Sequence, residues 1–378
     1  MDFEFSEAHQ IFRQALRQFI HIEVVPLVKE AEDSETFPKQ LFRKLGDLGY
    51  LCPGYDEELG GGGLGKIGEC ILIEELCKIN VGIGAAIMGG TGLALYSLLK
   101  YGHEKQKTEY LIPAIKGHKI AAFGLTEPNA GSDAAAIETT AKLVGRNYRI
   151  NGTKIYISNA PICDFIVVIA YTDKAKGTRG ISQLIMDRET PGLEINIMHK
   201  LGNRSASTAE LVFNNCEVPA ANLLGEEGKG FKYAMESLNG CRVTHGSRSL
   251  GVAEAAFEAS LDYAKTRVQF GKPIGKNQVI AFKIAKMATD IEAARSLLYR
   301  TALQYDSGDQ CRKEGPMTKW FCSEVAIRAA EEAMRIHAGA AYLAESPVGR
   351  YFRDAILSHI TEGTSEIQQL MIAAQLGL

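Results

Sequence analysis

The chain has 378 residues, of which 46% are hydrophobic and 23% are charged, and its formal net charge is -3. These values are typical of a folded chain of about two or three domains, and they exclude an intrinsically disordered protein. A net charge this close to zero gives no reason to expect a nucleic acid or an anionic membrane surface as a partner.

The sequence also gives expectations about compartment and metal content. We expect no apolar run to reach the roughly 18 residues that a membrane-spanning helix needs. The acidic stretch 1–7 has no basic region followed by an apolar one, so we expect no secretory signal. The eight cysteines form no C-x-x-C pair, which predicts reduced, buried thiols in a cytoplasmic protein. The histidines show no metal-binding spacing, so no metal is expected.

Residues 1–118 have the pattern of an α-helical domain. Ser6 is a candidate N-cap, and the apolar residues after it recur at spacings of three and four. Pro38 is expected to open a second helix, which Gly49 ends. The same helical pattern continues in two later stretches, residues 67–79 and 105–116.

Between those two stretches, residues 81–92 are rich in glycine and alanine. This composition is poor for a stable exposed helix, so the small residues must serve close packing against something. Two interpretations remain open at this point. The segment either lines a wide, short ligand pocket or packs tightly against other helices.

Residues 119–227 read as a β domain. Asn151-Gly152 stands between two β-type runs, and this dipeptide predicts a hairpin turn because both turn positions favour positive φ. Four more short strands separated by turn residues predict an antiparallel sandwich or barrel. They are expected at residues 165–171, 181–187, 193–198 and 209–213.

Residues 228–378 return to helical periodicity. Apolar faces predict helices around residues 250–264, 280–298, 320–337 and 365–376. Because the strands are grouped together rather than alternating with helices, the chain is of the α+β class. The predicted order is an N-terminal helical domain, a middle β domain and a C-terminal helical bundle.

Two glycine-containing segments are candidate binding motifs. Residues 60–65 match G-x-G-x-x-G, but an acidic run precedes them in place of a strand, which favours an ordinary loop. Residues 123–133, FGLTEPNAGSD, follow a short strand and break at Pro128 and Gly131. Their hydroxyls and freed backbone amides suit a polar ring edge or a phosphate, although a capped turn has the same composition.

The segment 123–133 resembles the flavin-binding signature of the acyl-CoA dehydrogenases. So do residues 152–160 (GTKIYISNA), 267–271 (RVQFG) with Gln278, and 361–368 (TEGTSEIQ). The motifs stand in the family's order and spacing, and the resemblance covers essentially the whole chain. It implies the acyl-CoA dehydrogenase-like fold, in which a β domain lies between helical domains and the last domain is a four-helix bundle.

The resemblance implies FAD as the cofactor and carries particular residues to it. Ser132 would contact both the cofactor and the CoA part of the substrate, and Tyr156 and Ser158 would cover one flavin face. The loop from Arg267 would reach the FAD of a neighbouring subunit, which implies a homotetramer. The implied cofactor set is Phe123, Leu125, Thr126, Ser132, Tyr156, Ser158, Arg267, Gln269, Phe270, Gln278, Arg335, Gly339, Thr364 and Glu366.

By the same resemblance Glu362 is the catalytic base. A carboxylate can take the α-proton of a thioester only if burial raises its pKa and hydrogen bonds stabilise the enolate oxygen. Gly363 would let the thioester approach the backbone closely. Read without the family, Glu362 is equally a carboxylate at a helix N-terminus.

The remaining implied contacts concern the substrate. Asn239 and Arg242 fall where the family binds CoA, and Thr91 lies in the segment that lines the acyl pocket. Some relatives place the base immediately before the arginine, where this chain has Cys241. A thiol there does not replace a carboxylate without strong activation, so Glu362 has no competitor.

The sequence therefore predicts a cytoplasmic FAD-dependent acyl-CoA dehydrogenase of carboxylic acid degradation. Its reduced flavin would pass electrons to electron-transfer flavoprotein. Thr361 before the base and the small residues near Thr91 favour a short, branched or alicyclic acyl group. Two alternatives stay open: a flavin oxidase or monooxygenase on the same fold, and a non-enzymatic flavin-binding relative. The second would need a basic region for nucleic acid, which the composition does not favour.

Overall fold

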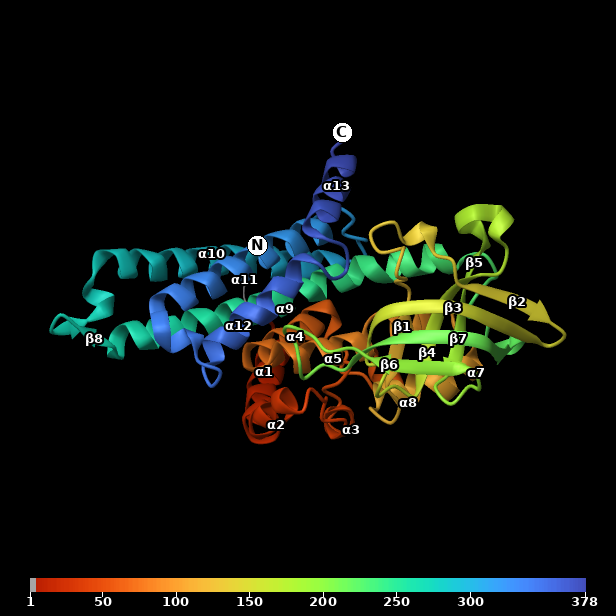
Figure 1. The fold of residues 1–378 in the computed structure, drawn as a ribbon, viewed down its shortest axis with the longest axis horizontal. Helices are drawn as coiled ribbons and strands as arrows, with labels where there is room; N and C mark the ends of the chain where they lie inside the picture. Colours follow the sequence, from red (N-terminus) through yellow and green to blue (C-terminus); the bar gives the residue numbers. More distant parts are fainter. Residues whose placement is uncertain (1–4) are drawn as a thin grey trace.

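The computed structural model describes residues 5–378. The expectation that no secretory signal is present was based on residues 1–7, and residues 1–4 of that stretch lie outside the described residues. The chain begins with a group of helices that pack on one another and on the rest of the molecule (Figure 1). They are α1 (Glu7–Phe19), α2 (Val28–Asp33), α3 (Gln40–Asp47), α4 (Gly65–Ile79), α5 (Val81–Thr91), α6 (Leu93–Tyr101), α7 (Glu104–Gln106) and α8 (Ile112–Ile115).

The first helices follow from local signals in the sequence. The Ser6 hydroxyl accepts the backbone N–H of His9, as an N-cap does, and α1 buries Phe12 and Leu16 at its apolar face. The glycine-rich stretch before α4 forms turns, with Gly60 and Gly63 at positive φ. It is therefore a loop, and no dinucleotide fingerprint is formed there.

The middle of the chain forms one sheet of seven strands in the order β1-β4-β2-β3-β7-β6, with β5 paired to β4. Most pairs are antiparallel, but β1–β4 and β2–β4 are parallel, so the sheet is mixed. The strands are β1 (Ala121–Gly124), β2 (Thr140–Val144), β3 (Asn147–Ser158), β4 (Phe165–Tyr171), β5 (Ile181–Asp187), β6 (Leu193–Ile197) and β7 (Thr208–Pro219).

The hairpin predicted at Asn151-Gly152 is wrong. Strand β3 runs straight through this dipeptide, and its register with β7 shifts there in a β-bulge. A Cβ on Gly152 would lie 2.5 Å from the Thr139 hydroxyl oxygen, so the glycine permits a close approach of the backbone. The turn that joins β2 to β3 is instead at Gly145, which has a φ of 62°.

The C-terminal region is a helical bundle that extends away from the sheet (Figure 1). Its longest member, α9, has 37 residues and runs from the sheet along the bundle to the hairpin β8–β9. The elements are α9 (Gly230–Thr266), β8 (Val268–Gln269), β9 (Lys272–Pro273), α10 (Gln278–Asp306), α11 (Glu314–His337), α12 (Pro347–Ile356) and α13 (Ser365–Gln375). The predicted order of helical, β and helical regions is confirmed, whereas α12 was not predicted.

One segment exceeds the expected length for an apolar run. By length and composition, Val81–Tyr101 is apolar enough to cross a membrane. However, 67% of its most apolar window is buried inside the protein, as in a core helix. All eight cysteines are free and buried, as predicted for buried thiols.

Candidate active site

Glu362 lies in the loop between α12 and α13, in a backbone conformation that is unusual for its residue type. Its φ is 57°, and that of Gly363 is 93°. A left-handed conformation at a residue other than glycine costs free energy and persists only where surrounding contacts fix it. The Oε2 atom of Glu362 is buried and has no hydrogen-bond partner within residues 5–378. The carboxylate therefore has an oxygen free to accept a proton.

Two polar side chains hold this loop in place. The Lys319 ammonium of α11 donates to the backbone carbonyl of Gly363 at 2.9 Å. The Gln368 amide of α13 donates to the carbonyl oxygens of Glu362 at 3.1 Å and of Gly363 at 2.9 Å. Both side chains are fully buried. No role was predicted for them from the sequence, although a lysine among the apolar residues of a bundle helix indicates a buried, paired charge.

The residue before the base is held as firmly as the loop itself. The Thr361 hydroxyl is hydrogen-bonded to the Nε2 atom of His245 at 2.9 Å, and Arg248 donates to it at 3.2 Å. His245 and Arg248 lie on α9 and are buried. Thr361 is therefore engaged in a polar network, and it does not line the cavity described below. The expectation that its small size widens the acyl pocket has no support in this geometry.

Two opposing effects determine the pKa of Glu362: burial of the carboxyl and the charge of nearby cations. Burial raises the pKa of the carboxyl to about 7, against the lowering effect of Arg248 and Lys319. The same burial lowers the pKa of Lys319 to about 8, and the Glu362 carboxylate raises it in part. Burial outweighs the nearby cations, so Glu362 changes protonation near neutral pH. A group with this pKa suits general base catalysis.

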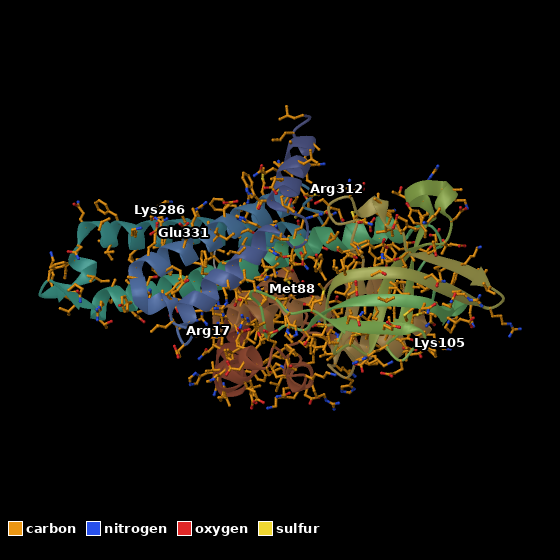
Figure 2. The ribbon with its side chains drawn as sticks, in the orientation of Figure 1. Arg17, Met88, Lys105, Lys286, Arg312 and Glu331 are labelled. Carbon is orange, nitrogen blue, oxygen red and sulfur yellow. The ribbon has the colours of Figure 1, made fainter. Side chains whose placement is uncertain are left out.

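A cavity of about 180 Å³ opens between α4, α5, α6 and α9. Met88, which lines it, lies where the N-terminal helices, the bundle and the sheet meet (Figure 2). Cys241 of α9 also lines it, and the pKa of this thiol is raised by burial and then by the Glu362 carboxylate. Glu362 itself does not line the cavity, but Cys241 on the cavity wall lies within electrostatic reach of it, and Cys241 is protonated at neutral pH.

The small residues of α5 are mostly explained by helix packing. A Cβ on Gly84 would lie 2.2 Å from the Cys77 sulfur, and one on Gly90 would lie 2.7 Å from the Phe42 ring. From the end of this segment, Thr91 and Gly92 line the cavity. Tight packing is therefore the better of the two interpretations for most of the segment, and Thr91 remains a candidate pocket residue.

Residues expected near the flavin form an outward-facing surface at one side of the sheet. Tyr156 and Ser158 alternate with buried Ile157 along β3, and the Tyr156 side chain is exposed at a φ of 60°. Phe123 and Leu125 are half-buried at the end of β1. An exposed aromatic ring beside half-buried apolar residues fits a flat ring system that binds partly in solvent. Thr126 is half-buried beside Leu125, whereas Ser132 is exposed on the following loop.

An ion pair that sequence reasoning missed fixes this loop. The Lys154 ammonium, fully buried on β3, donates to a Glu127 carboxylate oxygen at 2.7 Å and to the Leu125 carbonyl at 2.9 Å. Glu127 also accepts the backbone N–H groups of Glu138 and Thr139. Burial lowers the pKa of Lys154 to about 8, and Glu127 opposes this shift. Glu127 belongs to the segment 123–133 and Lys154 to the segment 152–160, both of which resemble flavin-binding motifs. Their ion pair fixes the first segment against the second.

The predicted CoA contacts lie together on α9. Arg242 donates to the Asn239 side-chain oxygen at 2.8 Å, and its Nε atom is buried without a partner within the described chain. The pKa of Arg242 is lowered by burial, against the effect of Glu362. A buried arginine with an unused donor beside the base is suited to bind an anionic or carbonyl group.

Other predicted cofactor residues lie at the opposite end of the bundle, around the β8–β9 hairpin (Figure 1). All of them are exposed, and the exposed fraction of Phe270 is 97%. The Arg335 guanidinium forms an ion pair with Glu331 at 2.5 Å. These residues are not brought together with Glu362 in one chain, an arrangement that was expected only for Arg267, Gln269 and Phe270. They are Arg267, Gln269, Phe270, Gln278, Arg335 and Gly339.

The last two predicted residues follow the base. The Thr364 hydroxyl caps α13 by accepting the backbone N–H of Ile367 at 3.3 Å. Glu366 is exposed, and hydrogen bonds from its own backbone and from Thr364 lower its pKa. Its negative charge acts on Lys319, one of the two side chains that hold the Glu362 loop, and opposes the lowering of the Lys319 pKa by burial.

Comparison with known proteins covers nearly the whole chain. Family models match residues 6–118 (acyl-CoA dehydrogenase, N-terminal domain), 122–216 (middle domain) and 228–377 (C-terminal domain). An acyl-CoA dehydrogenase of Bacillus subtilis is 41% identical over 372 residues, 98% of each chain. A short-chain specific acyl-CoA dehydrogenase of Clostridium acetobutylicum is 39% identical over 377 residues, 100% of each chain.

A solved structure agrees with this result. The butyryl-CoA dehydrogenase of Megasphaera elsdenii superposes with a TM-score of 0.96 at 39% identity, and the match covers 100% of both chains. An identity of 39% over the whole of both chains indicates a shared family and not only a shared fold. The chain belongs to the acyl-CoA dehydrogenase family and is an FAD-binding oxidoreductase.

Proposed function

We propose that the protein removes two hydrogens from the α- and β-carbons of a short acyl-CoA thioester, with Glu362 as the base. The observation that carries this proposal is the Glu362 carboxylate, which is buried, has a free Oε2 atom and has a pKa raised to about 7. A base of this kind is poorly hydrated and is ionised at neutral pH in part of the molecules. Both properties favour attack on a weakly acidic carbon.

The chain's own residues would carry out the proton half of the reaction. Glu362 takes the α-proton, and the backbone N–H of Glu362 donates to the thioester carbonyl, as the family resemblance implies. Lys319 and Gln368 keep the loop in the geometry that aims the carboxylate. The electron pair of the broken α C–H bond then forms the double bond as the β-hydrogen departs.

The FAD would lie on the surface formed by Phe123, Leu125, Thr126, Tyr156 and Ser158. These residues fit the group because they combine an exposed aromatic ring with half-buried apolar neighbours. When bound, FAD supplies the acceptor for the hydride that leaves the β-carbon. Arg267, Gln269 and Phe270 would hold the cofactor of a second subunit, and the exposure of Phe270 supports a homotetramer.

The substrate and electron acceptor are part of the proposal. We expect a short, branched or alicyclic acyl group, because the cavity is about 180 Å³ and is bounded by Thr91 and Gly92. Relatives named as short-chain specific are consistent with this size. A chain in a solved structure of the electron transferring flavoprotein of Acidaminococcus fermentans superposes with a TM-score of 0.97 at 39% identity, and such a flavoprotein is our proposed acceptor. A cytoplasmic location belongs to the same proposal.

The test is anaerobic mixing of the purified holoprotein with butyryl-CoA and with cyclohexanecarbonyl-CoA, while the flavin absorbance is followed. Rapid bleaching by at least one of the thioesters supports the proposal, and Glu362→Gln serves as the control. Admitting oxygen to the bleached enzyme distinguishes the oxidase alternative. Slow reoxidation is expected of a dehydrogenase, whereas rapid reoxidation would favour an oxidase.

A further inference from the structure

A charged pair forms part of the wall of the acyl cavity. Lys66 and Glu69 lie in the first turns of α4, and both line the cavity. Their side chains form an ion pair, with exposed fractions of 9% for Lys66 and 25% for Glu69. The other lining side chains are mostly apolar or aromatic, and Asp306 is a further charged one. Lys66 is also among the cations that lower the pKa of Glu362 against the effect of burial, which puts the pair within electrostatic reach of the base.

The pair has hydrogen-bonding capacity left over. Glu69 Oε2 accepts from Lys66 and from the Thr244 hydroxyl at 3.3 Å, whereas Glu69 Oε1 accepts no hydrogen bond within residues 5–378. The Lys66 ammonium has three N–H donors, of which one serves Glu69. The ammonium also lies 5.0 Å from the centroid of the Tyr305 ring. An acceptor on Glu69 and a donor on Lys66 thus remain available at the cavity wall.

The local charge disfavours two kinds of acyl terminus at this part of the cavity wall. Asp306 lies beside the pair, where its carboxylate accepts the backbone N–H groups of Lys66 at 2.6 Å and Ile67 at 3.3 Å. One ammonium therefore faces two carboxylates, so an anionic acyl terminus meets net repulsion. An apolar terminus would displace water from the ion pair without replacing its hydrogen bonds, which is unfavourable for partly buried charges.

We propose that the cavity selects an acyl group whose far end carries an uncharged hydroxyl, which accepts from Lys66 Nζ and donates to Glu69 Oε1. This inference rests on the proposed function, since it takes the cavity beside Glu362 as the acyl site. A hydroxyl satisfies the free donor and the free acceptor together and adds no charge. Hydrogen bonds to charged groups contribute enough to favour such a substrate by about 10- to 100-fold over an isosteric apolar one.

The test compares matched pairs of thioesters in the holoenzyme. The ring pair is 4-hydroxycyclohexanecarbonyl-CoA and 4-methylcyclohexanecarbonyl-CoA, and the chain pair is 5-hydroxypentanoyl-CoA and hexanoyl-CoA. In each pair a hydroxyl replaces a methyl group of similar size. The expected result is a kcat/KM ratio of about 10 to 100 in favour of the hydroxyl in at least one pair. A ratio of one or less in both pairs overturns the inference, as does a higher kcat/KM for glutaryl-CoA than for both hydroxylated thioesters.

A double variant assigns the preference to the ion pair. Lys66→Met with Glu69→Met removes both charges, and it should bring the hydroxyl-to-methyl ratio to about one or below. The matched control is Lys29→Met with Asp33→Leu, which removes an exposed pair on α2 and should keep the wild-type ratio. An unchanged ratio in a folded Lys66–Glu69 double variant would also contradict the inference.

Two further measurements keep the result decisive. If the double variant does not fold, the wild-type ratios still decide, and calorimetric binding of each matched pair to Glu362→Gln repeats the comparison without turnover. The failure of this inference differs from that of the proposed function. Flavin bleaching by butyryl-CoA with no hydroxyl preference rejects the inference alone, whereas bleaching by none of the thioesters rejects the proposed function and, with it, this inference.

Discussion

Replacing Glu362 by glutamine separates the chemical role of the carboxylate from its place in the fold. Glutamine is nearly isosteric and keeps the backbone N–H, so acyl-CoA binding should survive. It has no basic oxygen able to take the α-proton, and Cys241 beside the base is held protonated by burial. Loss of a positioned base costs on the order of 10²–10⁴-fold in rate. Flavin bleaching in a rapid-mixing experiment should therefore slow by at least about 100-fold.

The same substitution should raise stability above neutral pH. Burial moves the pKa of Glu362 from 4.5 to about 7, which corresponds to about 3 kcal/mol at the usual 1.36 kcal/mol for each tenfold change. Below pH 4.5 the carboxyl is protonated in both the folded and unfolded states, so it carries no penalty. As pH rises towards 7, ionisation of the unfolded chain lowers the stability of the wild type, and the loss is complete above pH 7.

Glutamine does not ionise, so the variant should escape this loss. Its free energy of unfolding, measured in urea, should exceed that of the wild type by up to about 3 kcal/mol at pH 8 and differ little at pH 4. The kcat/KM of the wild type should fall below pH 7 as the base becomes protonated. Bleaching by the variant within about tenfold of the wild-type rate, or equal stability at pH 8, would refute the assignment of Glu362 as a buried base.

Moving the carboxylate from position 362 to position 241 tests whether both positions flank the same α-carbon. The double variant Glu362→Gly with Cys241→Glu places the base on α9, in a residue that lines the cavity and senses the Glu362 charge. It should recover measurable flavin reduction relative to Glu362→Gly alone. No recovery in a folded, FAD-loaded double variant would contradict the view that the two positions flank one α-carbon.

Three other outcomes follow from the structure. Lys154→Met leaves the buried Glu127 carboxylate unpaired, so it should destabilise the protein by about 3–5 kcal/mol in urea unfolding and loosen FAD; a change below about 1 kcal/mol would contradict the role of the pair. Arg267→Ala should lower FAD retention and weaken subunit association, and unchanged FAD content and affinity would remove Arg267 from the cofactor site. Thr91→Leu should depress turnover of branched or cyclic thioesters more than that of butyryl-CoA, whereas a wild-type preference for chains of about twelve carbons or more would contradict a short pocket.

Much of the architecture could be predicted because it depends on periodic patterns. The spacing of apolar residues locates α1 and α10, and the bounds predicted for β4 and β5 match the structure. The hairpin predicted at Asn151-Gly152 is wrong because a glycine that permits a close backbone approach cannot be distinguished in the sequence from a turn glycine. Strand β3 continues there since Thr139, distant in sequence, packs against Gly152.

The site could be predicted only where a motif carries it. Glu362 follows from the resemblance, but its supports do not, because Lys319 and Gln368 reach the loop from two different helices. A sequence pattern does not record which buried lysine is aimed at which carbonyl. The same holds for Lys66 and Glu69, whose spacing on a helix is that of an ordinary surface pair until the packing of α9 and α10 encloses them.

The length of α9 has a consequence for how the catalytic units are composed. Arg242 lies about a third of the way along α9 and Arg267 directly follows its end, so at 1.5 Å per residue the two arginines are roughly 37 Å apart. No bending of a single chain brings Arg267 to its own Glu362. In the homotetramer that we propose, Arg267 would therefore act on the flavin of another subunit. Mixed oligomers of an Arg267→Ala chain and a Glu362→Gln chain would then contain some sites with both groups intact, and their activity should exceed that of either variant alone.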